Sequence, residues 1–411
     1  MRNLLNHFKA PLILLDQAVF SGTSFLVTIL LARTLSLEDF GVYAGLVLVL
    51  YLITSLISAF VVQPLQVNLP SSFYKIDYLS FTFWFQLALS TFLITWIPLL
   101  LMLPFDLIAQ HKDLALPAIL ISAGFVMHDY YRKRFLAEDR VTDTFLLDLQ
   151  LMAAHLLAAG YLLIAGSASL VPVLFLLALG YLPSFLTGLI FSKPTWSGIE
   201  HWPGFLKLHL NEGKWLFYTA LVQWWGGNLF VVASGFFLGA AALGALRLVQ
   251  SVFGVLNVLF QTFENYVLPQ TASRLHKSMD EGRRFLWKIG GQSLFAVSLL
   301  LLILFIFSDF IIVLAGGEQF REYGFLVKGM ALLYALIFTG YPIRIAIRAL
   351  VMNKIFFKGY LLTFLFGLLS SYLLLSFFQL TGAIAGLIFS QLILLIYWQS
   401  ELQKKHFLLW K

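Results

Sequence analysis

Apolar runs of about twenty residues, separated by short polar turns, make up almost the whole chain. A helix needs about 20 consecutive apolar residues to cross a hydrocarbon core of about 30 Å. The chain is 60% hydrophobic and 11% charged, whereas soluble domains carry roughly one quarter charged residues. These features exclude a soluble fold and predict an all-α integral membrane protein.

The apolar runs predict about twelve transmembrane helices. In a chain of 411 residues, these helices and their short turns leave little for a soluble domain. The predicted spans are 11–33, 41–63, 78–104, 114–128, 144–165, 168–191, 214–238, 240–268, 287–315, 324–348, 354–378 and 381–399.

The basic residues are distributed in a way that indicates topology. A net charge of +7 could indicate a nucleic-acid partner, but with the N-terminus in the cytoplasm almost all of the 27 Lys and Arg lie on the inner side. The exceptions are Arg33, Lys112 and Arg321 at outer ends and Arg247 and Lys328 inside spans. Because cytoplasmic loops are enriched in Lys and Arg, we expect both termini in the cytoplasm, contact with membrane lipids and no nucleic-acid partner.

The longest break in hydrophobicity runs from Ser192 to Gly213 and separates six helices from six. We therefore expect two lobes, residues 1–200 and 201–411. A weak repeat supports this division, since the turn Leu35–Gly41 resembles the turn Leu238–Gly244 and each joins the first two helices of its half. Repeats with the same direction are related by an axis along the membrane normal. The sequence thus predicts two six-helix lobes around a central cavity.

Two polar segments have structural interpretations. The segment Leu268–Lys288 is too polar to span, and we expect a cytoplasmic connector helix that rests on lipid headgroups. In the first outer loop, Ser36 and Asp39 have the spacing of a helix N-terminal capping box.

The eighth predicted helix carries a polar stripe. Its members follow one another at spacings of three and four and so share one face: Arg247, Gln250, Gly254, Asn257, Gln261 and Glu264. The stripe extends over about 26 Å at 1.5 Å per residue. It cannot face lipid, because a charge at the bilayer centre costs at least about 2.5 kcal/mol. It either forms inter-helix hydrogen bonds or lines a hydrated substrate cavity, and we favour the cavity. We expect alanine at Phe253 or Leu256, off the stripe, to be tolerated.

The tenth predicted helix has a proline, Pro342, followed by Arg344 and Arg348 one turn apart. Two guanidiniums on one face suit a diphosphate, because arginine contacts phosphate oxygens in bidentate fashion. The alternative is that the pair only anchors the inner end of the helix.

Titratable groups in the first and fifth predicted helices are candidates for ion coupling. Asp16 lies in the first helix, and Asp148 and His155 lie two turns apart in the fifth. Carboxyl groups within a membrane are often proton or cation sites, although structural pairing near the interface is equally compatible with these positions. The chain has no cysteine and no phosphate-binding loop of the GxxxxGK[ST] type. We expect no metal site, no cofactor and no ATP-driven pumping.

The stretch Leu246–Pro269, LRLVQSVFGVLNVLFQTFENYVLP, resembles Wzx-type polysaccharide flippases of the O-antigen and exopolysaccharide type. These belong to the superfamily that also contains the multidrug and toxin extrusion transporters. Further similar stretches are Asp16-Gln17 with Ser21-Gly22 and Phe25, Leu31-Ala32-Arg33 before Phe40-Gly41, and Tyr131-Arg132-Lys133-Arg134. The family usually has two adjacent arginines where this chain has Arg132 and Lys133.

The resemblance implies a flippase that is not an enzyme. It would move a polyprenyl-diphosphate-linked oligosaccharide across the bacterial inner membrane for lipopolysaccharide or exopolysaccharide biosynthesis, with polysaccharide polymerase and chain-length machinery as candidate protein partners. Sugar hydroxyls are costly to strip of water, so such a protein needs a hydrated path like the polar stripe.

Two alternatives remain open. One is an ion-coupled efflux transporter of the multidrug and toxin extrusion type. The other, a membrane glycosyltransferase or O-antigen polymerase or ligase, is less favoured because the predicted outer loops are short.

Overall fold

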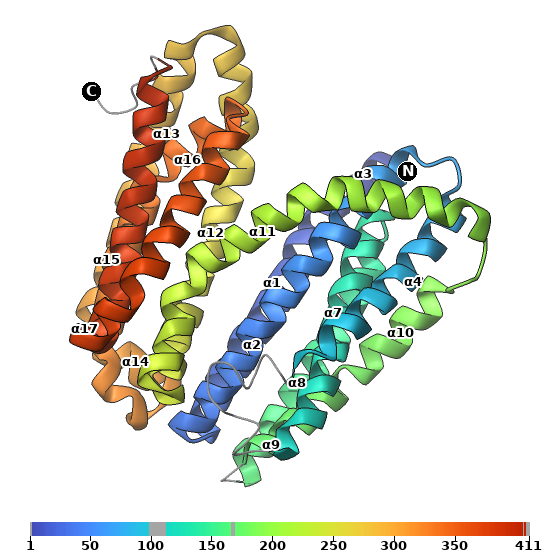
Figure 1. Cartoon of the computed structure of the whole chain (residues 1–411), viewed down its shortest axis with the longest axis horizontal. Coiled ribbons are helices and arrows are strands. Elements are labelled where there is room, and N and C mark those ends of the chain that lie inside the picture. Colours follow the sequence, from blue (N-terminus) through green and yellow to red (C-terminus); the bar gives the residue numbers. More distant parts are fainter. Residues whose placement is uncertain (1, 98–111, 166–168, 406, 408–411) are drawn as a thin grey trace. The chain divides into compact units, whose positions relative to one another are not determined.

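The computed structural model describes residues 2–97, 112–165, 169–405 and 407 (Figure 1). Every regular element within these residues is a helix. The chain divides into two compact units, Met1–Leu221 and Val222–Lys411. The boundary between them lies inside the helix α11 (Trp202–Leu238), and we describe each unit by itself.

Unit 1 is a bundle of helices (Figure 1). Two stretches are broken: α2 runs through a π-helix, η1, into α3, and α9 is separated at Tyr181 from α10, which has Pro183 in its first turn. The elements are α1 (Arg2–Thr34), α2 (Leu37–Ile57), η1 (Ser58–Val62), α3 (Gln63–Asn68), η2 (Leu69–Ser71), α4 (Lys75–Ile94), η3 (Lys112–Leu114), α7 (Ala115–Ala137), α8 (Val141–Ala165), α9 (Leu170–Gly180), α10 (Leu182–Ser192) and η4 (Ile199–His201).

Unit 2 begins within α11 and continues through long helices that turn back at short breaks. Gly239, with φ of 94°, allows the sharp turn that ends α11. The remaining elements are α12 (Ala240–Lys277), α13 (Met279–Ile306), α14 (Ser308–Gly316), η5 (Glu318–Tyr323), α15 (Gly324–Thr339), α16 (Tyr341–Ala349) and α17 (Asn353–Gln403).

The helix α17 comprises two crossings. Its 51 residues would extend about 76 Å as one straight helix, far more than a bilayer core. Gln379 breaks it with φ of 51° and ψ of −134°. Gly382 permits the turn, because a side chain there would meet the carbonyl oxygen of Leu374. This break coincides with the predicted gap between the last two spans.

The described residues contain nine helical stretches that are long and apolar enough to cross a membrane. One of the nine stretches, α17, is broken at Gln379 and covers two predicted spans. The helices α4 and α7 are not among the nine, and they coincide with two further predicted spans. Each of the predicted spans overlaps a helix, except that residues 98–104 and 168 lie outside the described part of the chain. The predicted all-α, multi-pass membrane fold is therefore confirmed.

Apolar side chains are exposed where lipid is expected to cover them. On α13, Phe295 is 79% exposed and Ile306 is 61% exposed. Interior residues such as Phe253 and Phe320 are completely buried. A large exposed apolar surface on a helical protein of this length is typical of contact with lipid.

The structure corrects two predictions about polar segments. No separate connector helix occupies Leu268–Lys288, because α12 continues to Lys277 and α13 starts at Met279 after Ser278 caps it by accepting a bond from the Glu281 amide at 3.0 Å. The span predicted to begin at 214 belongs to a helix that already begins at Trp202, within the segment Ser192–Gly213.

The start of this helix was predicted too late in the sequence, because the polar residues of the segment have partners elsewhere in unit 1. His209 is buried, with Nδ1 2.8 Å from the Phe60 carbonyl oxygen and Nε2 2.7 Å from the Tyr78 hydroxyl oxygen. The N-cap half of the predicted capping box is confirmed, since Ser36 Oγ accepts a bond from the Asp39 amide at 3.1 Å.

Candidate functional site

The helix α12 has three distinct faces within unit 2. One packs into the core, where the ring centroids of Phe253 and Tyr334 are 4.8 Å apart and those of Phe260 and Phe338 are 5.0 Å apart. A second face is apolar and exposed, with Leu259 53% accessible. The polar stripe runs between these two faces.

Most of the predicted stripe residues are half-buried or exposed. Arg247 donates from Nη1 to Gln250 Oε1 at 2.8 Å, and both side chains are half-buried. Asn257 donates to the Tyr334 hydroxyl at 2.9 Å, while Asn257 and Gln261 remain exposed. The stripe therefore presents amide and guanidinium groups on an accessible surface of unit 2.

At the end of the stripe, Glu264 meets the predicted arginine pair. Glu264 Oε2 lies 3.4 Å from Arg344 Nε, and its other oxygen, Oε1, pairs with Arg348 Nη1. The Glu264 side chain is 6% exposed, whereas those of Arg344 and Arg348 are 33% and 44% exposed. We call these three residues the Glu264 cluster. It places two guanidiniums against one carboxylate and leaves positive charge facing outward.

The break between α15 and α16 changes the direction of the chain and so determines where Arg344 and Arg348 lie. Gly340 and Pro342 separate the two helices, because proline cannot continue the backbone hydrogen bonding of the preceding helix. The redirected α16 packs against α12 and α17. Arg344 then lies over the rings of Tyr341 and Phe356, at 5.6 and 6.0 Å from their centroids.

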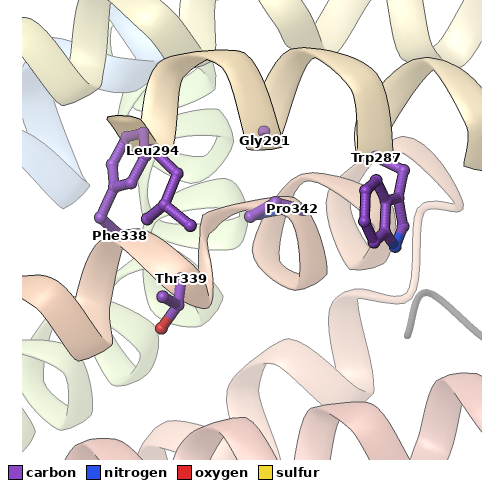
Figure 2. A pocket seen from close by; sticks show the side chains of 7 residues that line it. Trp287, Gly291, Leu294, Phe338, Thr339 and Pro342 are labelled. Carbon is purple, nitrogen blue, oxygen red and sulfur yellow. The ribbon is translucent and has the colours of Figure 1, made fainter. Parts of the chain in front are cut away.

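A small apolar pocket lies on another side of α16, next to α13 (Figure 2). Its volume of about 90 Å³ is far below the 300–1,000 Å³ typical of ligand pockets. Its lining contains no charged side chain, so it is not a site for a saccharide headgroup. The lining residues are Trp287, Gly290, Gly291, Leu294, Phe338, Thr339 and Pro342.

Unit 1 contains a second charged cluster, centred on Arg132. Arg132 donates from Nε to Asp148 Oδ2 at 2.7 Å and from Nη2 to Asp16 Oδ2 at 2.6 Å. The same Nη2 lies 3.2 Å from Gln17 Oε1. The ring of Phe20 lies 4.3 Å from the guanidinium carbon. Asp16 and Asp148 are each 1% exposed.

His128 completes this group, which we call the Arg132 cluster (Asp16, Gln17, His128, Arg132 and Asp148). His128 Nε2 lies 3.0 Å from Asp148 Oδ1, and Nδ1 lies 3.1 Å from Ser184 Oγ. Ser184 in turn donates to the Tyr181 carbonyl oxygen at 3.1 Å. Asp16 Oδ1 has no hydrogen-bond partner among the described residues.

The predicted ion-coupling residues are thus only partly brought together. Asp16 and Asp148 share Arg132. His155 makes different contacts, with Nε2 3.1 Å from the Leu177 carbonyl oxygen and its ring 4.8 Å from that of Tyr181, which also lies 6.0 Å from the ring of His128.

Sequence reasoning missed His128 and Arg132 as cluster members. The predicted fourth span ended at residue 128, because the following charged residues were read as a cytoplasmic loop. In the structure α7 continues to Ala137 and buries both side chains. The useful signal was the presence of carboxylates in two other predicted spans, since a buried carboxylate requires a partner.

The expectation for Phe253 and Leu256 also changes. Both are buried, at 0% and 3% exposure. Removing a buried Phe side chain costs about 3–5 kcal/mol, so alanine at these positions is expected to destabilise unit 2. Leu259, on the exposed apolar face, is a better control position.

Comparison with known proteins gives structural matches. No family model matches the chain, and no curated protein sequence matches it. The lipid II flippase MurJ in an inward closed conformation is similar over 96% of this chain and 87% of its own, with 14% identity and a TM-score of 0.72.

Transporters of the multidrug resistance MATE family are similar as well. An inward-facing member, described as belonging to the MOP superfamily, matches 95% of this chain and 94% of its own, with 10% identity and a TM-score of 0.70. A eukaryotic transporter of this kind, AtDTX14, matches 94% and 95%, with 15% identity and a TM-score of 0.56. At these identities the similarity concerns the fold. The chain therefore has the fold shared by the lipid II flippase MurJ and the MATE transporters.

Proposed function

We propose that this protein is a flippase that moves a polyprenyl-diphosphate-linked oligosaccharide across the cytoplasmic membrane for surface polysaccharide biosynthesis. The observation that carries this proposal is the Glu264 cluster, where two partly exposed guanidiniums face one buried carboxylate at the end of an accessible polar stripe. A surplus of guanidinium groups attracts a diphosphate, and arginine can bind its oxygens in bidentate fashion.

The order of groups along α12 suits a headgroup that moves stepwise. Arg344 and Arg348 capture the diphosphate at the inner end, and Arg247 offers a cation 17 residues along α12 from Glu264, which is about 26 Å. Gln250, Asn257 and Gln261 between them can exchange hydrogen bonds with sugar hydroxyls. Neutral groups in the middle keep the headgroup hydrated without holding it too tightly for release.

The Arg132 cluster supports proton coupling of this transport. If His128 carries a proton only on Nε2, the Ser184 hydroxyl can donate either to Nδ1 or to the Tyr181 carbonyl oxygen, but not to both. A doubly protonated His128 satisfies all three contacts. It also balances the two carboxylates against two cations. We assign one coupled proton to this cluster.

The bacterial inner membrane, with both termini in the cytoplasm, is the location we propose. Single-cysteine labelling tests the topology cleanly, because the chain has no native cysteine. Cysteines placed at positions 203 and 279 should react only after the membrane is made permeable. Labelling of either position in intact cells would contradict the orientation.

Ion-coupled efflux of cationic drugs is the second candidate, because MATE transporters share the fold and the Arg132 cluster contains two carboxylates but only one arginine. The Glu264 cluster argues against it, since an outward-facing pair of guanidiniums repels cations.

A vesicle assay distinguishes the two functions. The purified protein is reconstituted into liposomes that contain a fluorescent geranylgeranyl-diphosphate-linked saccharide, and a membrane-impermeant reductant then bleaches the lipid of the outer leaflet. Flipping makes the inner-leaflet lipid accessible and increases the bleached fraction. Parallel vesicles measure uptake of the cationic dye ethidium under a proton gradient.

The proposal predicts increased bleaching with mono-, di- or trisaccharide lipids and no gradient-driven dye uptake. Protein-free vesicles and vesicles with the Arg344→Gln, Arg348→Gln double variant are the controls. Dye uptake without lipid flipping would assign the protein to the efflux class instead.

A further inference from the structure

Glu264 is the one acidic member of a stripe proposed to guide an anion. Its carboxylate does not face outward, because its side chain is only 6% exposed. It contacts the same two arginines that are proposed to capture the diphosphate. Arg348 Nη1 donates to Glu264 Oε1, and Arg344 Nε lies 3.4 Å from Glu264 Oε2 as an ion pair, so the carboxylate and a phosphate compete for the same positive charge.

We propose that Glu264 is an internal competitor for the diphosphate. It neutralises part of the charge of the arginine pair when substrate is absent, and the diphosphate must displace it to interact with the full charge of both guanidiniums. This role rests on the proposed function and deepens it, because Glu264 then sets how tightly the headgroup is held and allows its release.

Charge explains why a flippase benefits from such a competitor. Two guanidiniums without a counter-charge would bind a diphosphate strongly, since hydrogen bonds between charged groups are among the strongest in proteins. The captured headgroup has to leave again for the far leaflet. A carboxylate that returns to the arginines as the diphosphate departs compensates for part of the lost interaction, and therefore lowers the barrier to release.

The surroundings of the cluster make this exchange feasible. The rings of Tyr341 and Phe356 lie beside Arg344 and hold its guanidinium group in place while its partner changes. The partly exposed sides of Arg344 and Arg348 allow a phosphate to approach before Glu264 withdraws.

A positioning role is the opposing interpretation, and it predicts the opposite effect. If Glu264 only holds the arginines in a binding geometry, then Glu264→Gln disorders them and weakens anion binding. If Glu264 competes, Glu264→Gln removes the competing charge while keeping the shape of the side chain, and anion binding becomes tighter.

The test measures binding of farnesyl diphosphate to the purified full-length protein in detergent by isothermal titration calorimetry. Glu264→Gln should bind about tenfold more tightly than the unmodified protein, a change of about 1.4 kcal/mol. The same variant should flip lipid-linked saccharide more slowly in vesicles at saturating substrate, because release is impaired.

Two further variants keep the test decisive. Glu318→Gln removes a carboxylate that is 71% exposed and paired with Arg321, so it matches the change in net charge and should leave binding unchanged. Gln261→Glu adds a second carboxylate on the exposed stripe one turn from Glu264. It should weaken binding about threefold or more, and it keeps the proposal testable if Glu264→Gln does not fold.

Unchanged or weaker binding by folded Glu264→Gln overturns the competitor role but leaves the flippase proposal intact, provided that the unmodified protein binds the diphosphate. Unchanged binding by Gln261→Glu also counts against it. Absence of farnesyl diphosphate binding in the unmodified protein and in every variant overturns both proposals.

Discussion

The two charged clusters have opposite compositions and opposite exposure. In unit 1, Arg132 is buried between two buried carboxylates, those of Asp16 and Asp148. In unit 2, one buried carboxylate, Glu264, holds two guanidiniums that are each at least 33% exposed. A buried group with two carboxylates and one arginine can accept a proton, but its side chains are not accessible to a large ligand. An accessible group with a guanidinium excess can bind an external anion.

The largest effect should come from Arg132→Met, which leaves two buried carboxylates without their guanidinium. Breaking a buried ion pair in this way costs about 3–5 kcal/mol, so most of the folded protein should be lost. Size-exclusion chromatography of a fluorescent fusion and thermal unfolding in detergent measure this loss.

The neighbouring residue provides the control for that loss. Lys133 pairs with Asp129 at 2.8 Å in a partly exposed contact, so Lys133→Met should change stability by less than about 1 kcal/mol. Equal stability of the Arg132 and Lys133 variants would show that the unit 1 cluster does not have the buried, structural character described above.

The double variant Arg344→Gln, Arg348→Gln should separate transport from stability. Glutamine keeps a neutral polar donor near Glu264, unlike methionine at position 132, so the loss of stability should be smaller than for Arg132→Met and the protein should still fold and insert. Loss of two charged contacts with the diphosphate, worth about 1.5–3 kcal/mol each, should reduce flipping by about a hundredfold or more. Surface-polysaccharide production in a host that lacks the native gene, together with membrane protein levels, checks both parts.

If the double variant supports normal polysaccharide at normal expression, the Glu264 cluster is an anchor at the helix end and the proposed substrate site is wrong.

Arg247 should show a smaller, chemistry-dependent effect. Arg247→Ala should reduce flipping by about tenfold, as expected for one charged contact of about 1.5 kcal/mol. Arg247→Lys should flip faster than Arg247→Ala if charge alone matters, and as slowly as Arg247→Ala if bidentate contact matters. The initial flipping rate in vesicles measures both variants. Leu259→Ala, on the exposed apolar face of the same helix, should leave the rate unchanged.

The sequence was sufficient to predict the fold and the stripe because both depend on local patterns. Apolar runs of span length identify the crossings, and spacings of three and four place Arg247, Asn257 and Gln261 on one face. The gap near residue 379 was found in the same way, since two spans need a turn between them.

The composition of the clusters could not be predicted, because it depends on which helices are neighbours. Arg132 was assigned to a loop, and only the packing of α7 against α8 and α1 against α8 brings its guanidinium to Asp148 and Asp16. Likewise, the pairing of Glu264 with Arg348 joins residues 84 positions apart in the sequence. The start of α11 was missed because polar residues lower the hydrophobicity of this segment. Some of these residues, such as His209, are nevertheless buried within unit 1.

We assign proton coupling to the Arg132 cluster and diphosphate binding to the Glu264 cluster. Flipping rates measured with and without a proton gradient across the vesicle membrane test these two roles most directly. His128→Gln keeps a neutral side chain of similar reach, so it should retain flipping without a gradient but lose the stimulation that the gradient gives the unmodified protein. Arg344→Gln, Arg348→Gln should abolish flipping under both conditions. The account is contradicted if His128→Gln is stimulated as strongly as the unmodified protein, or if the double arginine variant flips normally without a gradient.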